Sequence, residues 1–189
     1  MQSVTFITGN QRKVDYLKQW LGLPVRHHKL DLDELQSLDT RVVAEHKARQ
    51  AYKMLQEPVL IEDTALTFVA MGRLPGTYIK WFLEEIGAAG LCKIAGTLPS
   101  RQAYATVTYA FCDGKDVHFF TGRVDGVVAP EPRGGGGMGW DPAFIPDGST
   151  KTFAEMTPDE VTQFSPRVRA IKPLKAFLLA QHKGASHGN

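Results

Sequence analysis

Two acidic residues, Glu62 and Asp63, directly follow the apolar triplet Val59-Leu60-Ile61. The triplet predicts an interior strand, and ligand sites in open α/β sheets lie beyond the carboxyl ends of strands. Carboxylates are costly there unless they are exposed or bind a cation, and their hard oxygens suit Mg²⁺ or Mn²⁺. Glu34, close to the end of another expected strand, would supply a further acidic group. The alternative is that these are acidic residues in turns and helix caps.

A second candidate is the segment Thr8-Gly9-Asn10-Gln11-Arg12-Lys13, which joins an expected strand to an expected helix. A strand that enters a helix through a glycine turn presents backbone N–H groups at the positive end of the helix, and this favours an anion. Asn10 adds amide donors, and Arg12 and Lys13 add positive charge. The segment is therefore a candidate phosphate-binding loop, although it lacks the GxxxxGK[ST] pattern. The alternative is a capped turn with solvated basic residues.

Lys47 and Lys80 are further candidates for binding an anion. Lys47 lies at the edge of the apolar stripe of a helix expected over residues 40–55, and Lys80 lies in the aromatic segment Tyr78-Ile79-Lys80-Trp81-Phe82. Either could instead be a partly buried lysine that extends its amine to solvent.

A glycine-rich segment, Gly134-Gly135-Gly136-Gly137-Met138-Gly139, matches GxGxxG. It leads into Trp140-Asp141-Pro142 and not into a helix, so we interpret it as a mobile loop and not as a dinucleotide site. Trp140 itself could be a core aromatic. The sequence contains no HExxH, GxSxG, kinase signature or clustered Cys/His set for zinc.

The apolar patterns place these residues on alternating strands and helices, followed by a long hairpin. Strands are expected over 4–8, 26–30, 59–61, 102–112 and 117–128, and helices over 13–21, 40–55, 78–94 with breaks near Gly87 and Gly90, and 166–182. This order predicts an α/β fold, with an elongated mixed sheet and flanking helices. We expect a single domain over residues 1–183 and a flexible tail over 184–189.

Composition narrows the class of protein. The 189 residues are 43% hydrophobic and 22% charged, as in ordinary globular proteins. A net charge of +2 is too balanced for binding nucleic acid by bulk charge. There is no run of 18 apolar residues for a membrane span, no signal-peptide pattern, and only two cysteines, Cys92 and Cys112, which we expect to be reduced. These features predict a soluble cytoplasmic protein with no nucleic-acid or membrane partner.

Taken together, the motifs closely resemble the inosine triphosphate pyrophosphatase family in its eukaryotic form, over roughly Val4 to Leu179. Their order and spacing carry the resemblance, which rests on Thr8-Gly9-Asn10-x-x-Lys13, Val59 to Thr64, Leu74-Pro75-Gly76, Tyr78 to Leu83, Gly139-Trp140-Asp141-Pro142, Pro146-Asp147-Gly148, Thr152 to Met156 and Ser165-x-Arg167-x-Arg169. The resemblance implies a long twisted sheet with two lobes around a nucleotide cleft. It also implies a homodimer that uses Mg²⁺ or Mn²⁺ to hydrolyse ITP, dITP and XTP to the monophosphate and pyrophosphate.

The resemblance assigns roles residue by residue. Glu34 and Asp63 would be metal ligands, and Asp63 would also be the catalytic base. The implied substrate contacts comprise the phosphate residues Thr8, Asn10, Lys13, Lys47 and Lys80, the base-pocket residues Met138, Gly139, Trp140, Asp141, Pro166 and Arg167, and also Gly9, Gln11, Arg12, Glu62 and Asp63.

Three positions of the implied base pocket depart from the family pattern. Met138 stands where an aromatic residue is usual, Pro166 where histidine is usual, and Val161 where a lysine is common. The base preference is therefore left open, whereas the residues implied to bind phosphate all match the family pattern. Two alternatives remain. One is the related septum-formation-type nucleotide pyrophosphatases, which typically carry a serine-rich start with an arginine where this chain has Thr8-Gly9-Asn10. The other is a catalytically inactive nucleotide-binding protein.

Overall fold

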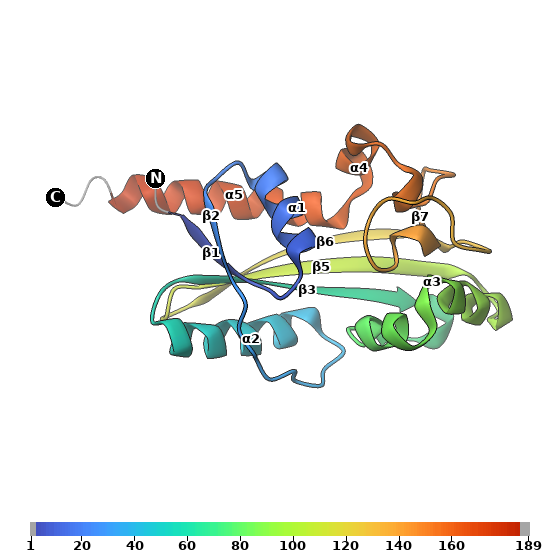
Figure 1. Ribbon diagram of the computed structural model, residues 1–189, viewed down its shortest axis with the longest axis horizontal. Coiled ribbons are helices and arrows are strands. Elements are labelled where there is room, and N and C mark those ends of the chain that lie inside the picture. Colours follow the sequence, from blue (N-terminus) through green and yellow to red (C-terminus); the bar gives the residue numbers. More distant parts are fainter. Residues whose placement is uncertain (1–2, 186–189) are drawn as a thin grey trace.

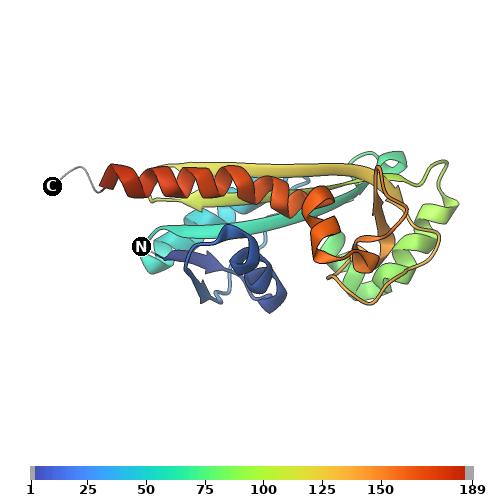
Figure 2. The same ribbon diagram turned by 90° about the horizontal axis from the view of Figure 1, so that it is seen from above.

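The computed structural model describes residues 3–185 and consists of one long, twisted sheet with helices on both faces (Figures 1 and 2). The seven strands have the order β2-β1-β3-β5-β6-β7, and β4 pairs with β3. The strands are β1 (Val4–Ile7), β2 (Val25–His28), β3 (Val59–Phe68), β4 (Pro75–Gly76), β5 (Gln102–Cys112), β6 (Val117–Val128) and β7 (Phe144–Pro146). The helices are α1 (Gln11–Leu21), α2 (Thr40–Leu55), α3 (Ile79–Thr97), α4 (Pro158–Phe164) and α5 (Pro166–Ala185), with 3₁₀ turns at Val69–Met71, Asp141–Ala143 and Phe153–Glu155. The predicted α/β class with an elongated mixed sheet is confirmed.

Local signals in the sequence explain where the first helices begin and end. The Asn10 side chain caps α1 by accepting from the Arg12 N–H, and Asp39 caps α2 in the same way through Arg41. Helix α1 ends at Gly22, whose φ of 67° is the left-handed conformation that glycine adopts without strain. The bounds of α2, β5 and β6 agree with those expected from the sequence.

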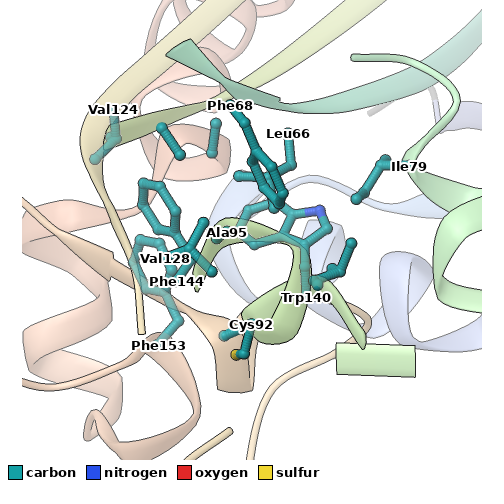
Figure 3. Packing of buried hydrophobic residues seen from close by; sticks show 14 residues of the cluster. Leu66, Phe68, Ile79, Cys92, Ala95, Val124, Val128, Trp140, Phe144 and Phe153 are labelled. Carbon is teal, nitrogen blue, oxygen red and sulfur yellow. The ribbon is translucent and has the colours of Figure 1, made fainter. Parts of the chain in front are cut away.

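Helices α1 and α5 cover one face of the sheet, and α2 covers the other (Figures 1 and 2). A hydrophobic cluster lies between the sheet and the helices on each face. Leu17 and Leu174 belong to the cluster beneath α1 and α5, and Ala48 and Ile61 belong to the cluster beneath α2. At the far end, α3 and the residues around β7 form a third cluster, in which Trp140 packs near Phe144 and Phe153 (Figure 3). The long strands β3, β5 and β6 run through both ends, so the two lobes share one continuous sheet.

The structure corrects the expected end of the third strand. Strand β3 does not stop at Ile61 but continues to Phe68, paired with β5 along its whole length. Its other edge is paired with β1 only as far as Ile61 and with β4 only from Leu66. Within residues 3–185, no strand pairs with that edge from Glu62 to Ala65, which leaves an opening in the sheet.

Other differences are smaller. Strand β2 ends at His28 rather than Leu30, and the short elements β4, β7 and α4 were not expected. Helix α3 is interrupted at Gly87, whose φ of 62° and ψ of −175° are not helical, so the break expected near Gly87 is confirmed, whereas Gly90 shows no such break. Helix α5 continues to Ala185, while residues 186–189 of the expected tail lie outside the described residues. Both cysteines are free and buried, and no helix in the described part of the chain is long and apolar enough to cross a membrane.

Candidate active site

A cavity of about 850 Å³ occupies the opening beside β3. It is bounded by the loop between β1 and α1, the segment before α2, the N-terminal part of α3 and the loop before β7. The structure thus brings together most of the residues that the sequence singled out, namely Thr8, Gly9, Asn10, Lys13, Glu34, Lys47, Glu62, Asp63, Lys80, Met138, Gly139, Trp140 and Arg167.

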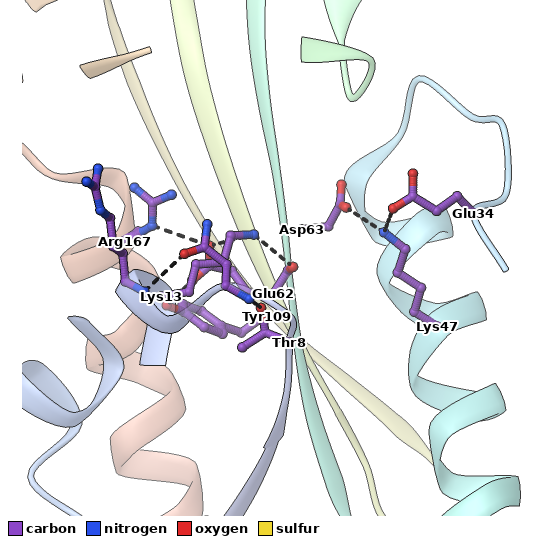
Figure 4. Close-up of polar contacts among 10 residues, drawn as sticks. Thr8, Lys13, Glu34, Lys47, Glu62, Asp63, Tyr109 and Arg167 are labelled. Carbon is purple, nitrogen blue, oxygen red and sulfur yellow. Dashed lines mark hydrogen bonds and ion pairs between the residues drawn. The ribbon is translucent and has the colours of Figure 1, made fainter. Parts of the chain in front are cut away.

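On the α1 side of the sheet, Glu62 is the centre of a buried ionic cluster (Figure 4). Its Oε1 lies 3.2 Å from Lys13 Nζ and accepts a hydrogen bond from Arg167 Nε at 3.3 Å, and its Oε2 accepts one from Tyr109 Oη at 2.7 Å. Burial alone would raise the pKa of Glu62, but the charges of Lys13 and Arg167 and the Tyr109 hydrogen bond hold that pKa below its usual value. Glu62 is therefore an ionised internal partner that orients a lysine and an arginine at the cavity.

On the opposite side, Asp63 faces α2 (Figure 4). Lys47 Nζ lies 3.6 Å from Asp63 Oδ1 and 3.4 Å from Glu34 Oε1, and Lys80 Nζ lies 3.6 Å from the same Glu34 oxygen. Burial raises the pKa of Asp63 to about 6, although Lys47 and Lys13 oppose the shift. Asp63 Oδ2 is buried and has no hydrogen-bond partner among residues 3–185. A buried carboxylate oxygen left in this state indicates a missing ligand.

The donor set at this place fits a divalent cation. Glu34 and Asp63 both approach the ammonium group of Lys47, so two hard carboxylate oxygens already lie around one site of positive charge. No group of three His, Cys, Asp or Glu side chains suited to a metal occurs among the described residues. One or two carboxylates are enough to hold an ion such as Mg²⁺ when substrate phosphates and water complete its shell.

The loop before α1 lines another part of the cavity, with Thr8, Gly9 and Asn10. The Thr8 hydroxyl accepts a hydrogen bond from the Asn10 N–H at 3.1 Å, which shapes the turn at the positive end of α1. Gln11 and Arg12 do not line the cavity. Gln11 instead donates to Asp15 on its own helix, and Arg12 Nη1 donates to the Gly137 carbonyl at 3.1 Å, which joins the two loops.

A second cavity, of about 220 Å³, shares Met138, Trp140 and Arg167 with the first. The predicted residues Asp141 and Pro166 line this smaller cavity but not the larger one. Asp141 is buried, which raises its pKa, and its Oδ2 accepts a hydrogen bond from the Met138 N–H at 2.6 Å. Trp140 is both a core aromatic and a wall of the two cavities.

Sequence reasoning missed three polar groups in this region. Tyr109 belongs to no motif, but its hydroxyl on Glu62 could have been anticipated because a buried tyrosine usually finds a hydrogen-bond partner. Tyr16, whose hydroxyl lies 2.7 Å from Ser165 Oγ, and Trp20 line the smaller cavity from α1. No motif contains these two residues, and only their helical spacing indicated that they share a face.

Comparison with known proteins gives one consistent result. A protein of Batrachochytrium dendrobatidis named inosine triphosphate pyrophosphatase is 44% identical over 191 residues, covering 99% of this chain and 100% of that protein. One of Trypanosoma cruzi, named inosine triphosphate pyrophosphatase 2, is 45% identical over 177 residues, covering 92% of this chain and 90% of that protein. These relatives confirm the resemblance that the motifs carry.

Solved structures show the same fold. The Ham1 protein of Staphylococcus aureus matches with a TM-score of 0.82 at 24% identity, covering 95% of this chain and 100% of that one. A HAM1 protein of Coxiella burnetii matches with a TM-score of 0.83 at the same identity and coverage. The model of the Ham1 family matches residues 4–177, and with relatives this similar over nearly its whole length, the chain belongs to the Ham1 family.

Proposed function

We propose that this protein hydrolyses ITP, and with it dITP and XTP, to the nucleoside monophosphate and pyrophosphate. The observation that carries the proposal is the arrangement around Asp63. A buried carboxylate with a free oxygen lies beside Glu34 and Lys47, in a cavity that also contains Lys13, Lys80 and the positive end of α1. The names of the relatives support the substrate class, since they are called inosine triphosphate pyrophosphatases.

The lysines account for binding of the triphosphate. A chain of phosphates is strongly anionic, and charge-assisted hydrogen bonds from ammonium groups are among the strongest available to a protein. Lys13 and Lys47 are each held by a carboxylate, Glu62 and Asp63, which fixes their amines at the cavity before substrate arrives. We infer that Thr8 and Asn10 complete this phosphate site.

Asp63 is the group that positions water. Its unpartnered Oδ2 accepts a hydrogen bond from the attacking water, and its raised pKa, about 6, suits a general base that works near neutral pH. The water oxygen bonds to the α-phosphorus, the bond from that phosphorus to the bridging oxygen breaks, pyrophosphate leaves, and the proton passes to Asp63. Glu34 and Asp63 would hold Mg²⁺ or Mn²⁺, which when bound polarises the phosphoryl oxygens.

The smaller cavity, lined by Met138, Trp140, Asp141, Pro166 and Arg167, is the proposed site of the base, and Gly139 lies beside it in the wall of the larger cavity. Inosine and xanthine carry a 6-keto acceptor where adenine carries an amino donor, so donors in this cavity would favour the keto bases. The family resemblance is also the support for a homodimer, while a cytoplasmic location is the expectation from composition.

Product analysis tests the proposed reaction. The protein is incubated with ITP and Mg²⁺, and the early products are separated by chromatography. We expect IMP and pyrophosphate in equal amounts, and IDP with phosphate as the main products would contradict the proposal. A panel of other nucleoside triphosphates tests the septum-formation-type activity, which would hydrolyse nucleotides other than ITP. If the protein hydrolyses no nucleotide at all, the alternative of a nucleotide-binding protein is left.

A further inference from the structure

The indole of Trp20 carries a hydrogen-bond donor that nothing in the described part of the chain satisfies. Its Nε1 is buried and has no partner within that part. An indole N–H can only donate, and such groups usually find an acceptor when they are buried. An unsatisfied buried donor is a rare and costly feature, so a partner that binds from outside would remove the cost.

Trp20 lies where such a partner would bind. It lines the smaller cavity, which is the site proposed above for the base. Much of the surrounding wall has no side-chain donor, since Met138, Val161 and Pro166 are apolar. Trp20 thus contributes to a mainly apolar part of the wall, and its buried N–H is a donor that the described residues leave uncommitted.

Several polar atoms nearby are occupied within the protein, although the Gln19 amide and the Arg167 Nη groups are further donor groups of residues that line this cavity. The Ser165 hydroxyl pairs with that of Tyr16, the Met138 N–H donates to Asp141, and the Arg167 Nε donates to Glu62. A ligand that needed these groups would have to break existing hydrogen bonds, whereas Trp20 Nε1 has none to lose.

Tyr16 holds the indole in place. The two rings are one helical turn apart on α1, with centroids 6.1 Å apart and planes tilted by 48°. The Tyr16 hydroxyl is tied to Ser165 Oγ at 2.7 Å, next to the start of α5, and Arg167 Cζ lies 5.6 Å from the Tyr16 ring centroid. A side chain fixed in this way can present its N–H without a further entropic cost on binding.

We propose that Trp20 is a specificity-determining residue, whose indole N–H donates a hydrogen bond to a ring carbonyl oxygen of the bound base. The inference rests on the proposed function, because it takes the smaller cavity as the base site. A carbonyl oxygen accepts this bond, but the 6-amino group of adenine cannot, so Trp20 favours ITP over ATP.

Trp20→Phe is the first test, because it keeps an aromatic ring and removes the N–H. The loss of one hydrogen bond between neutral groups predicts a fall in kcat/KM for ITP of about 3- to 10-fold, with kcat/KM for ATP changed less. The matched control is Tyr52→Phe, which removes a hydroxyl from a residue of α2 that lines neither cavity. That control should alter both substrates alike and leave the ITP:ATP ratio unchanged.

A second measurement does not depend on catalysis or on the variant's folding. The unsubstituted protein is labelled with ¹⁵N at its indoles and titrated with IMP and, separately, with AMP. Both nucleotides stack their rings in the same way, so stacking alone shifts the signal equally. The hydrogen bond forms only with IMP, so we expect the Trp20 indole N–H signal to move downfield with IMP and to move much less with AMP. Equal shifts with the two nucleotides, or an unchanged ITP:ATP ratio in Trp20→Phe, would overturn the role of Trp20.

The two proposals fail in different ways. If the protein releases pyrophosphate from ITP but Trp20 fails both tests, only the specificity role is lost. If no pyrophosphate is released and IMP still shifts the Trp20 signal more than AMP does, the proposed reaction is wrong and the base contact stands.

Discussion

Glu62 and Asp63 are consecutive residues of one strand, yet their carboxylates serve opposite faces of the sheet. Side chains alternate along a strand, so Glu62 points to Lys13 of α1 and Arg167 of α5, while Asp63 points to Lys47 of α2. Both reach the same cavity because the edge of β3 is unpaired at this point. The two carboxylates therefore have different surroundings: Glu62 holds a lysine and an arginine of the protein, whereas Asp63 is the proposed catalytic base, and substitutions can separate the two parts.

Asp63→Asn should remove activity and keep the fold. Asparagine has nearly the same shape but cannot accept the proton from water, so we expect kcat for ITP to fall by about 100-fold or more. Burial raises the pKa of Asp63 to about 6, which means that its ionised form opposes folding near neutral pH. The melting temperature of the variant should therefore stay the same or rise. Steady-state kinetics and thermal unfolding check both parts, and a kcat close to that of the wild type would contradict the catalytic role.

Glu62→Gln, in contrast, should lower the stability of the fold. It leaves Lys13 and the buried Arg167 without their anion, and breaking a buried ion pair typically costs about 3–5 kcal/mol. We expect the midpoint of thermal unfolding to fall by roughly 10 °C. Glu45→Gln is the matched control, since it breaks an exposed pair with Arg49 and should change stability far less. Similar small shifts in the two variants would mean that the Glu62 cluster does not stabilise the fold.

Much of this fold follows from local patterns in the sequence. Asn10 and Asp39 mark the starts of α1 and α2, and the alternation from Gln102 to Cys112 gives β5 its bounds. The position of Glu62 and Asp63 inside a continuing strand could not be inferred in this way. It depends on β5 pairing across ten residues of β3 while β1 stops short, and these contacts join segments about fifty residues apart.

The surroundings of the proposed base site were harder to predict for a related reason. Motif reasoning correctly placed Trp140 and Arg167 at a common site, but it took Gln11 and Arg12 as neighbours of the substrate because they belong to the phosphate-loop motif. The helical turn that begins at Asn10 directs Gln11 toward Asp15 and Arg12 toward Gly137. Whether either contacts a bound nucleotide remains a prediction.

Removal of divalent metal should abolish ITP hydrolysis. Treatment with EDTA followed by desalting leaves Glu34 and Asp63 with the lysines Lys47 and Lys80 as their charged neighbours, and added Mg²⁺ or Mn²⁺ should restore the rate. Glu34→Gln should raise the metal concentration needed for half-maximal activity. Asp33→Asn provides the comparison, because Asp33 is bound to Gln50 by hydrogen bonds in both directions and does not line the cavity. Full activity in EDTA would refute the metal requirement.

Gly137→Ala should disturb the junction between the two cavities. Gly137 has a φ of 74°, and an added Cβ would lie 2.5 Å from Asp141 Oδ2, the atom that accepts from the Met138 N–H. The left-handed conformation alone costs a residue with a side chain about 1–2 kcal/mol. We expect lower stability and a raised KM for ITP. Gly135→Ala is the control, since its Cβ would meet nothing within 4 Å, and equal effects in both variants would contradict this interpretation.

Pro166→His should change base preference and leave the metal requirement unchanged. Pro166 begins α5 and lines only the smaller cavity, so its replacement lies apart from Glu34 and Asp63. A histidine there would add a ring N–H or an acceptor nitrogen to a wall in which proline has neither. One hydrogen bond to the base predicts a change of about 3- to 10-fold in the ITP:ATP ratio of kcat/KM. The Mg²⁺ concentration for half-maximal rate should not move, because no phosphate contact is altered. The measurement is kcat/KM for both nucleotides over a range of Mg²⁺ concentrations in the variant and the wild type. A shift in the Mg²⁺ dependence with an unchanged ratio would show that residue 166 acts on the phosphate end, and the smaller cavity would then not be the base site.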